Sequence, residues 1–354
     1  STMIKHLLKD SYSYITFDSL EQRHRFYSEP ENFLASNNRK VVFDEVQLVP
    51  ELFPALKIIT DDNPEDKGRF VLTGSGQFLL SRNISESLAG RIGLIPLLPM
   101  QYMEVPDSFA ADFAKKGGYP EIVSGSFTNV NLYFDSYLNT YLQKDLRQML
   151  NVTDLSAFTQ LIHLLSVRVA QPLNLTDISK ETGITVATLS KWISVLEASY
   201  IIFLLRPFHN NFGKRLVKTP KVYFYDNGLL SFLSGIGYSA TSEKDPLSGA
   251  IFENMVISEV LKSIYHNGIT ARIYFIRTNH GEEVDLVIEF HDSVKLIEIK
   301  SSHTLKVQYL KNMEKLSEKQ WTKHIVYQGE TMKINENAKA WNFHDFLCTD
   351  PRLL

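Results

Sequence analysis

Cysteine is nearly absent from this chain: its 354 residues include a single one, Cys348. That excludes a framework of intramolecular disulfides and a zinc site built from several thiolates, and it fits a reducing compartment. Long hydrophobic runs are also lacking. The longest, residues 92–100, is broken by two prolines, whereas a membrane-spanning helix needs about 20 apolar residues. No basic segment followed by an apolar one opens the chain, so we expect a cytoplasmic protein without a membrane segment.

Charge of one sign is not in excess either. Lys and Arg number 37 against 40 Asp and Glu, a net charge of −3, so any nucleic-acid site must be a local basic patch rather than a general positive field. The ten histidines show no spacing typical of metal ligands. Apolar residues make up 44% of the chain, enough for sizeable cores, and the length favours two or three domains.

Four segments differ in their pattern of apolar residues. Residues 1–105 alternate apolar strands with helices, which predicts a parallel sheet covered on both faces. Residues 106–165 are typical of a helical connector, and 166–238 begin with three short helices over 166–206. Residues 239–354 return to α/β and end in a helical tail, so the predicted fold class is α/β with a helical middle. The predicted strands are 14–18, 40–44, 69–75, 222–225, 271–278, 283–290, 294–301 and one near 324–327.

Two acids end an apolar strand in the run Val41-Val-Phe-Asp44-Glu45. In open parallel sheets, ligands bind at the carboxyl ends of the strands. An acid pair there suits nucleotide hydrolysis, in which the first carboxylate holds hydrated Mg²⁺ and the second polarises the attacking water. Thr73 ends the next strand and is placed to sense a γ-phosphate, and Arg91 can neutralise charge on a transferring phosphoryl group. The alternatives are ordinary acids at a sheet edge and an arginine in a salt bridge.

Residues 173–196 have the pattern of a helix-turn-helix. Thr176 is the expected N-cap of the first helix, Gly183 supplies a left-handed turn, and Thr185 is the expected N-cap of the second helix. The predicted core positions are Ile178, Ile184, Leu189, Ile193 and Leu196. The predicted outward face of the second helix, which would approach a DNA major groove, carries Thr185, Thr188, Lys191 and Ser194.

A basic segment follows at residues 213–221. Its cations can contact the phosphates of a DNA duplex without reading sequence. The alternative is that the three helices form a packing module between domains and that the basic segment is a solvated loop. The predicted phosphate contacts are Lys214, Arg215, Lys218 and Lys221.

Two acids and a lysine recur on consecutive strands of the C-terminal segment. The side-chain period of two puts Glu298 and Lys300 on one face of their strand and allows Asp285, on the preceding strand, to converge with them. Two carboxylates suit Mg²⁺ or Mn²⁺. The spacing resembles the PD-(D/E)XK nuclease motif, which implies Glu253, on the preceding helix, as a further metal-side acid with Glu259 as the alternative. A cross-strand salt bridge is the other interpretation.

The whole chain resembles prokaryotic AAA+-like ATPases that are fused to a winged-helix unit and a restriction-endonuclease-like half. The resemblance rests on Val-Phe-Asp-Glu-Val-Gln, Leu-Thr-Gly-Ser and Ser-Leu-Ala-Gly-Arg occurring in this order. It implies that Asp44 and Glu45 form a Walker B pair, that Thr73 is a sensor, and that Arg91 is a finger or a phosphate-contacting arginine. A finger supplied across a subunit boundary would imply a homo-oligomer. It also implies ATP and Mg²⁺ as cofactors, with Asp44, Asp285 and Glu298 as metal ligands.

One departure from that family concerns the phosphate loop. The family begins with a strand and Gly-x-x-x-x-Gly-Lys-[Ser/Thr]-Thr, whereas the glycines and the lysine are not in this sequence. Ser1 and Thr2 correspond to the end of the loop and are the predicted cofactor-binding residues. We therefore expect this chain to be an excerpt that begins inside the loop, with negligible ATPase activity of its own. The alternative is a protein that cannot bind ATP in the usual way.

Together these features predict a cytoplasmic ATPase. Its domains are an AAA+-like core over residues 1–105, a helical connector over 106–165, a winged helix-turn-helix over 166–238 and a nuclease-like domain over 239–354. The C-terminal half would bind or cut DNA. The alternatives are a catalytically decayed scaffold and a nucleotide-dependent switch that binds a protein partner.

Overall fold

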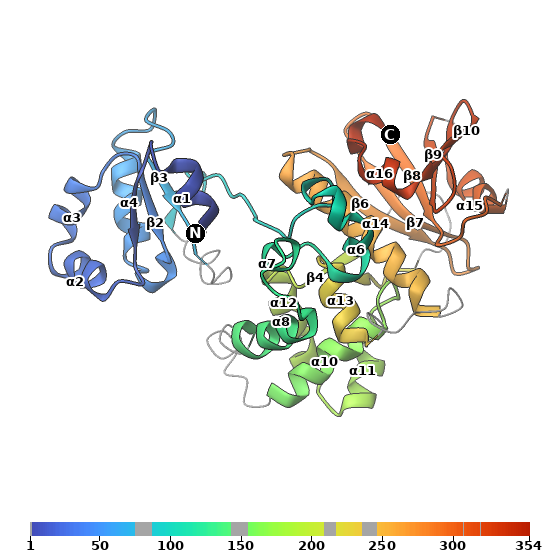
Figure 1. Ribbon diagram of the computed structural model, residues 1–354, viewed down its shortest axis with the longest axis horizontal. Coiled ribbons are helices and arrows are strands. Elements are labelled where there is room, and N and C mark those ends of the chain that lie inside the picture. The colour runs from blue at the N-terminus through green and yellow to red at the C-terminus, as the bar shows by residue number, and fades with distance from the viewer. Residues whose placement is uncertain are drawn as a thin grey trace. The chain divides into compact units, whose positions relative to one another are not determined.

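The computed structural model describes residues 2–74, 87–142, 155–208, 217–235, 246–306, 308–318 and 320–354. The chain forms two compact units, Ser1–Leu94 and Ile95–Leu354 (Figure 1). Each unit has its own buried hydrophobic core.

The first unit is built on a small parallel sheet in the order β1-β2-β3. The central strand β2 is fully buried: a strand pairs with it on each side, and Val41 and Phe43 pack into the core of this unit. Phe17, Phe26, Phe33 and Phe43 pack around it with neighbouring ring centroids 5.6–6.3 Å apart. The elements are α1 (Thr2–Leu8), β1 (Ser13–Thr16), α2 (Leu20–Ser28), α3 (Pro30–Ser36), β2 (Val41–Asp44), the 3₁₀ turn η1 (Val46–Leu48), α4 (Leu52–Asp61) and β3 (Phe70–Leu72).

The second unit contains a mixed sheet of eight strands in the order β10-β11-β9-β8-β7-β6-β4-β5. The pairs β4–β6, β8–β9 and β9–β11 are parallel and the other four are antiparallel. The strands are β4 (Ile202–Pro207), β5 (Lys221–Phe224), β6 (Arg272–Arg277), β7 (Glu283–Glu289), β8 (Val294–Ile299), β9 (Thr322–Tyr327), β10 (Met332–Asn335) and β11 (Ala338–Asn342). The chain is thus an α/β protein with a small parallel sheet followed by a large mixed one.

Of the helices of the second unit, α12 to α16 contact strands of this sheet, whereas α8, α10 and α11 gather away from it (Figure 1). The longest, α14, packs on β5 and β8, and α15 packs on β7, β8 and β9. The described helices of the second unit are the short η2 (Tyr102–Glu104), α6 (Asp107–Lys116), α7 (Pro120–Val123), α8 (Val130–Tyr137), the π-helical η3 (Leu138–Leu142), α10 (Leu155–Val167), α11 (Leu175–Thr182), α12 (Val186–Ala198), α13 (Asn227–Ser234), α14 (Pro246–His266), α15 (Gln308–Leu316), α16 (Phe343–Leu347) and η4 (Pro351–Leu353).

Two of the predicted helical regions contain strands instead. Residues 202–206, expected to close a run of three helices, belong to β4, because five consecutive apolar residues from 201 to 205 fill a sheet position between β5 and β6. The predicted helical tail is wrong as well. It contains the antiparallel pair β10–β11, and only short helices follow.

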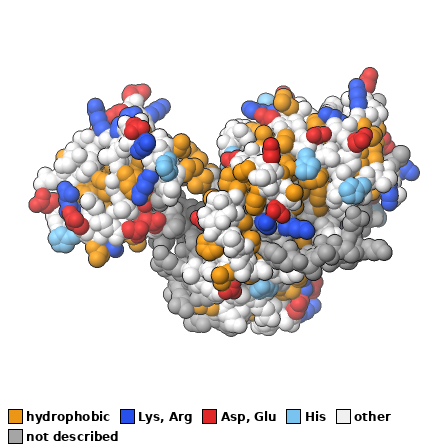
Figure 2. Space-filling model, in the orientation of Figure 1, with side chains coloured by type: hydrophobic (Ala, Val, Ile, Leu, Met, Phe, Trp, Pro, Cys, Tyr) orange, Lys and Arg blue, Asp and Glu red, His pale blue; other side chains and the backbone are white. Residues whose placement is uncertain are grey.

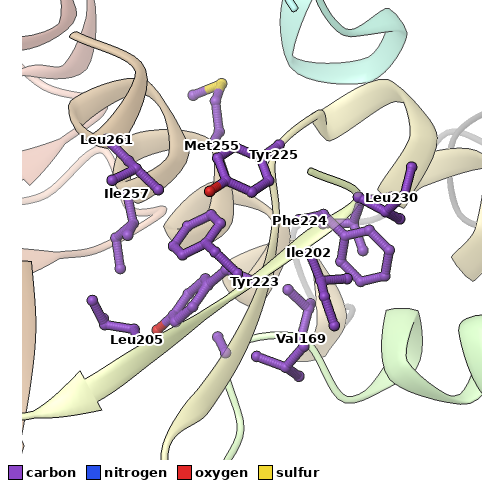
Figure 3. Packing of buried hydrophobic residues seen from close by; sticks show 14 of the residues in the cluster. Val169, Ile202, Leu205, Tyr223, Phe224, Tyr225, Leu230, Met255, Ile257 and Leu261 are labelled. Carbon is purple, nitrogen blue, oxygen red and sulfur yellow. The ribbon is translucent and has the colours of Figure 1, made fainter. Parts of the chain in front are cut away.

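The sheet continues across the domain boundary predicted after residue 238. Strands β4 and β5 precede that boundary and β6–β11 follow it, yet all eight belong to one sheet. Figure 3 shows how β5 joins the layers: Ile257 and Leu261 of α14 lie on the side of Tyr223, and Val169 and Leu230 lie on the side of Phe224. The helix-turn-helix segment and the C-terminal segment therefore share a core.

Close backbone contacts hold α6 against α13. A Cβ atom on Gly228 would lie 2.1 Å from the carbonyl oxygen of Lys116, and one on Gly118 would lie 2.1 Å from that of Met100. Asp226 links the same segments, since its carboxylate accepts from the backbone N–H of Gly118 at 2.7 Å and caps α13. Only a residue without a side chain fits at these two glycines.

The substitution Gly228→Ala should therefore destabilise the second unit by about 2–3 kcal/mol, because the added methyl group forces two backbones apart. The midpoint of urea unfolding measures this change. Gly249→Ala is the matched control: Gly249 is also helical, its Cβ would meet only Ser301 Oγ at 3.7 Å, and alanine favours a helix. An unchanged midpoint for Gly228→Ala would contradict the tight contact.

Candidate functional site

The predicted acid–acid–lysine group comes together at the end of β8. Ile297 and Ile299 enter the largest core cluster, so Glu298 and Lys300 point to the opposite face of the strand. The Lys300 Nζ atom lies 3.1 Å from Asp285 Oδ2 and 2.8 Å from Glu298 Oε1. Asp285 Oδ2 also accepts the backbone N–H of Ile299 at 2.8 Å. This contact fixes the carboxylate where the start of β7 lies beside the end of β8.

Glu253, near the start of α14, faces the same group of acids. Its Oε1 atom accepts from the Tyr223 hydroxyl at 2.6 Å and lies 3.2 Å from Lys221 Nζ. Glu259, the alternative acid, belongs to a separate buried contact: it pairs with Lys262 Nζ at 2.8 Å and accepts the backbone N–H of Tyr102 at 2.7 Å. Of the two helix acids, the structure thus brings only Glu253 to the cluster.

Burial and mutual repulsion raise the pKa of two of these carboxyl groups. Burial first, and then the Asp285 charge, raise the pKa of Glu298 to about 8, although Lys300 opposes the shift. The same two causes raise the pKa of Glu253 to about 7 against the opposing effect of Lys221. Glu298 Oε2 is buried and has no hydrogen-bond partner. The cluster therefore holds more carboxyl groups than its lysines neutralise.

These carboxylates fit a hard divalent cation at Asp285 and Glu298. The unpartnered Glu298 Oε2 offers an oxygen ligand, and oxygen is the donor that Mg²⁺ and Mn²⁺ prefer. Among the residues with a described position, no three His, Cys, Asp or Glu side chains are already arranged to hold a metal ion. Two carboxylates completed by water would suffice, since Mg²⁺ usually keeps several of its waters.

Lys221 is not the exposed phosphate contact that the basic segment predicts. It is 2% exposed, and its Nζ atom lies 2.5 Å from Glu283 Oε1 in addition to its contact with Glu253. The neighbouring carboxylates raise its pKa above the usual lysine value despite burial. The prediction is wrong because Lys221 opens the buried strand β5. The available signal was its spacing from Tyr223: residues two apart in an apolar strand point to the same side. This signal was missed.

The other predicted DNA contacts have different settings. Lys218 is exposed, whereas Lys214 and Arg215 lie outside the described residues. On α12, Thr185, Lys191 and Ser194 are exposed and Thr188 is half-buried. The predicted core side of the two helices, from Ile178 to Leu196, packs into the core.

The turn chemistry of the helix-turn-helix is largely as predicted. Gly183 is left-handed with φ of 73°, and the Thr185 side chain caps α12 by accepting from the backbone N–H of Thr188. The predicted cap Thr176 is wrong. Asn174 caps α11 instead, because the helix begins at Leu175 and the Asn174 side chain accepts from two backbone N–H groups of the first turn.

In the first unit, Asp44 and Thr73 meet at the carboxyl ends of β2 and β3. Thr73 Oγ1 donates to Asp44 Oδ1 at 2.7 Å, and the Tyr14 hydroxyl donates to Asp44 Oδ2. Glu45 follows with a left-handed backbone, φ of 55°, and accepts from the Gln47 amide. The predicted acid pair and the predicted sensor thus share one edge of the sheet.

The remaining predicted residues of this unit are less closely associated. Arg91 is half-exposed and pairs with Asp61 at the end of α4, with Nη2 3.1 Å from Oδ2. Thr2 begins α1 and is exposed, and Ser1 lies outside the described residues.

Comparison with known protein families places an AAA domain at the N-terminus, matched over residues 1–106. Two domains of unknown function follow, DUF8612 over residues 111–240 and DUF4143 over residues 248–346. The AAA domain suggests an ATPase-type function and, with it, binding of ATP and Mg²⁺. To this extent the resemblance seen in the sequence is confirmed.

The relatives of this chain come from distant organisms. An uncharacterized protein of Mycobacterium tuberculosis is 29% identical over 282 residues, which cover 78% of this chain and 62% of that protein. Another, from Haemophilus influenzae, is 23% identical over 337 residues, covering 84% of this chain and 80% of the relative. A third, from Methanocaldococcus jannaschii, is 23% identical over 343 residues, covering 88% and 73%. The chain spans about three fifths of the length of the mycobacterial relative. Among the described helices, none is long and apolar enough to cross a membrane.

The raised pKa of Glu298 predicts a pH-dependent stability. An unfolded glutamate ionises near pH 4.5, whereas folded Glu298 keeps its proton until about pH 8. The folded state therefore binds more protons between these values, so the free energy of unfolding should fall as pH rises, by at most about 1.4 kcal/mol per pH unit from this group. Urea unfolding in EDTA from pH 5 to pH 8.5 measures the slope.

The substitution Glu298→Gln should flatten that slope, because the uncharged amide has no proton to lose. Glu336→Gln, at an exposed position in the β10–β11 turn, is the control and should leave the slope unchanged. If wild type and Glu298→Gln lose stability in parallel as pH rises, the pKa of Glu298 is not raised.

Proposed function

We propose that the C-terminal site hydrolyses phosphodiester bonds of DNA with a divalent metal ion, in a protein whose AAA domain binds and hydrolyses ATP. The observation that carries the proposal is the convergence of Asp285, Glu298 and Lys300, with a buried and unpartnered oxygen on Glu298. If Lys300 formed only a salt bridge, one carboxylate would be enough, because a second buried carboxylate adds a charge that must also be compensated.

Each side chain has a distinct proposed role. Asp285 and Glu298 would hold Mg²⁺ or Mn²⁺, which when bound polarises the scissile phosphate. Lys300 is about a third exposed, so its ammonium group can reach a substrate phosphate while remaining near both acids. It would orient the attacking water and offset the negative charge that develops on the phosphate.

The proposed roles in the AAA domain follow the edge shared by β2 and β3. Asp44 would hold the Mg²⁺ of the nucleotide, Glu45 would polarise the attacking water, and Thr73 would contact the γ-phosphate. Arg91 would act on the transferring phosphoryl group of a neighbouring subunit, which requires release from Asp61 and a homo-oligomer. The contact between Thr73 and Asp44 supports this proposal, since it places the acid and the sensor together.

The nuclease proposal predicts metal-dependent cleavage of DNA that disappears on substitution of the site. Asp285→Asn and Lys300→Met should each reduce cleavage of supercoiled plasmid with Mn²⁺ by about 10²–10³-fold, because each removes charge that stabilises the transition state. Lys333→Met, at an exposed position on β10, is the control and should cleave as wild type does. Tight DNA binding without cleavage in wild type would instead support a decayed scaffold.

DNA binding by the helix-turn-helix is a second proposed function. It is supported by the exposed side chains of Lys191 and Ser194 on one face of α12 and of Thr185 at its N-cap. The net charge of −3 gives no general attraction for DNA, so we expect modest affinity from a few contacts. In the face that Figure 2 shows, acidic and basic side chains of the described residues are likewise interspersed.

Lys191→Ala should weaken binding to a fluorescent DNA duplex and reduce the slope of log affinity against log salt by about one, the value for one lost phosphate contact. Fluorescence anisotropy at several salt concentrations measures both quantities. Lys311→Ala, at an exposed position on α15, should change neither. Wild type without salt-sensitive DNA affinity would favour the switch that binds a protein partner.

A further inference from the structure

Lys221 is the most enclosed cation of the acid cluster. Its Nζ atom lies 3.2 Å from Glu253 Oε1 and 2.5 Å from Glu283 Oε1, and it lies 5.4 Å from the centre of the Phe275 ring. The side chain is 2% exposed, so water contributes little to its solvation. The ammonium group thus occupies a position between carboxylates of α14 and β7.

The same oxygen of Glu253 receives two donors. Lys221 Nζ and the Tyr223 hydroxyl both bind Glu253 Oε1, and both come from β5, two residues apart on one side of the strand. Strand β5 therefore holds the Glu253 carboxylate through two donors. Asp285, whose charge adds to burial in raising the Glu253 pKa, is paired with Lys300 instead. In this state Lys221 provides the positive charge that a metal ion would otherwise supply.

We propose that Lys221 is an internal cation that competes with a divalent metal ion for Glu253. Glu253 becomes a metal ligand only when the Lys221 ammonium group leaves it, and until then the metal is held by Asp285 and Glu298 alone. This inference rests on the proposed function, because it concerns the same metal site. It makes Lys221 a positioning residue that sets metal affinity.

The charges around Lys221 explain the competition. Glu253, Glu283 and Asp285 attract it, and Arg277 also contacts Glu283 at 3.6 Å. A divalent cation bound to Glu253 would lie next to the Lys221 ammonium group, which is 3.2 Å from Glu253 Oε1. Two neighbouring cations in a buried site repel each other strongly. Loss of the ammonium group leaves Glu253 and Glu283 buried with less compensation, which costs stability without metal and favours a metal ion.

A purely structural role for Lys221 leads to a different result. Its loss would then lower stability equally with and without metal, and would leave metal affinity unchanged. The exposed Lys218→Met is the matched control, since it removes the same charge from the same segment without a cluster contact.

The test is Mn²⁺ binding by isothermal titration calorimetry, with thermal unfolding midpoints in Mn²⁺ and in EDTA. Lys221→Met should bind Mn²⁺ about tenfold more tightly than wild type, the effect of one charge-assisted contact, and should gain more in midpoint on adding Mn²⁺. In a double-mutant cycle, Glu253→Gln should abolish this gain. Unchanged affinity in Lys221→Met, or a gain that persists with Glu253→Gln, overturns the inference.

Two further variants keep the outcomes distinct. If Lys221→Met does not fold, Lys221→Gln carries no charge but still donates to Glu253, and the same gain is expected. Asp285→Asn tests the proposed metal site itself and should abolish Mn²⁺ binding in the wild-type background. Binding that is sensitive to Asp285 but indifferent to Lys221 overturns this inference alone. Binding that is insensitive to Asp285 overturns the metal site, and the inference with it.

Discussion

The second unit depends on the neutralisation of buried carboxylates. Burial raises the pKa of Glu253 on α14 and of Glu298 in the sheet, the charge of Asp285 raises both further, and Lys221 and Lys300 compensate these effects only in part. Removing one partner of a buried charge pair costs far more than an exposed pair contributes, because the remaining charge has no solvent. This constraint links the start of α14 to β5 through Lys221, which also pairs with Glu283 at the start of β7. The arrangement costs stability, because a hydrophobic cluster of the same volume would need no compensation.

The sequence predicts those parts of the site that depend on local geometry. Alternation along β7 and β8 is enough to place Asp285, Glu298 and Lys300 on one face, since successive side chains of a strand point to opposite faces. It does not show which face is covered, because both faces of these strands are buried. The choice between Glu253 and Glu259 is different. Six residues on a helix turn the side chain to another face, so both cannot reach one cluster. Which face meets the sheet depends on tertiary packing, and the sequence alone favoured Glu253 only through its resemblance to a nuclease motif.

The errors also have physical causes. In the sequence Lys221 belongs to a basic segment. In the structure its ion pair with Glu283 joins β5 to β7, two strands that are distant in the sequence. Thr176 and Asn174 can both cap a helix, and the choice depends on a start that sequence patterns locate only to within a few residues. Strand β4 is a continuous apolar run, which periodicity cannot distinguish from a buried helix of the same length. For Lys221 and β4 the missing information is which distant segment lies opposite.

The cluster is shared between the two C-terminal family matches. Lys221 and Tyr223 lie within residues 111–240, whereas Glu253, Asp285, Glu298 and Lys300 lie within residues 248–346. The common sheet explains this division, because β5 delivers Lys221 and Tyr223 to a helix and strands that follow it in the chain. Residues 248–346 alone would leave Glu253 and Glu283 without Lys221, and would expose the edge of β6 that β4 covers. The acid cluster therefore makes the two matched regions one structural unit, and links the helix-turn-helix to the proposed metal site through the strand that bears Lys221.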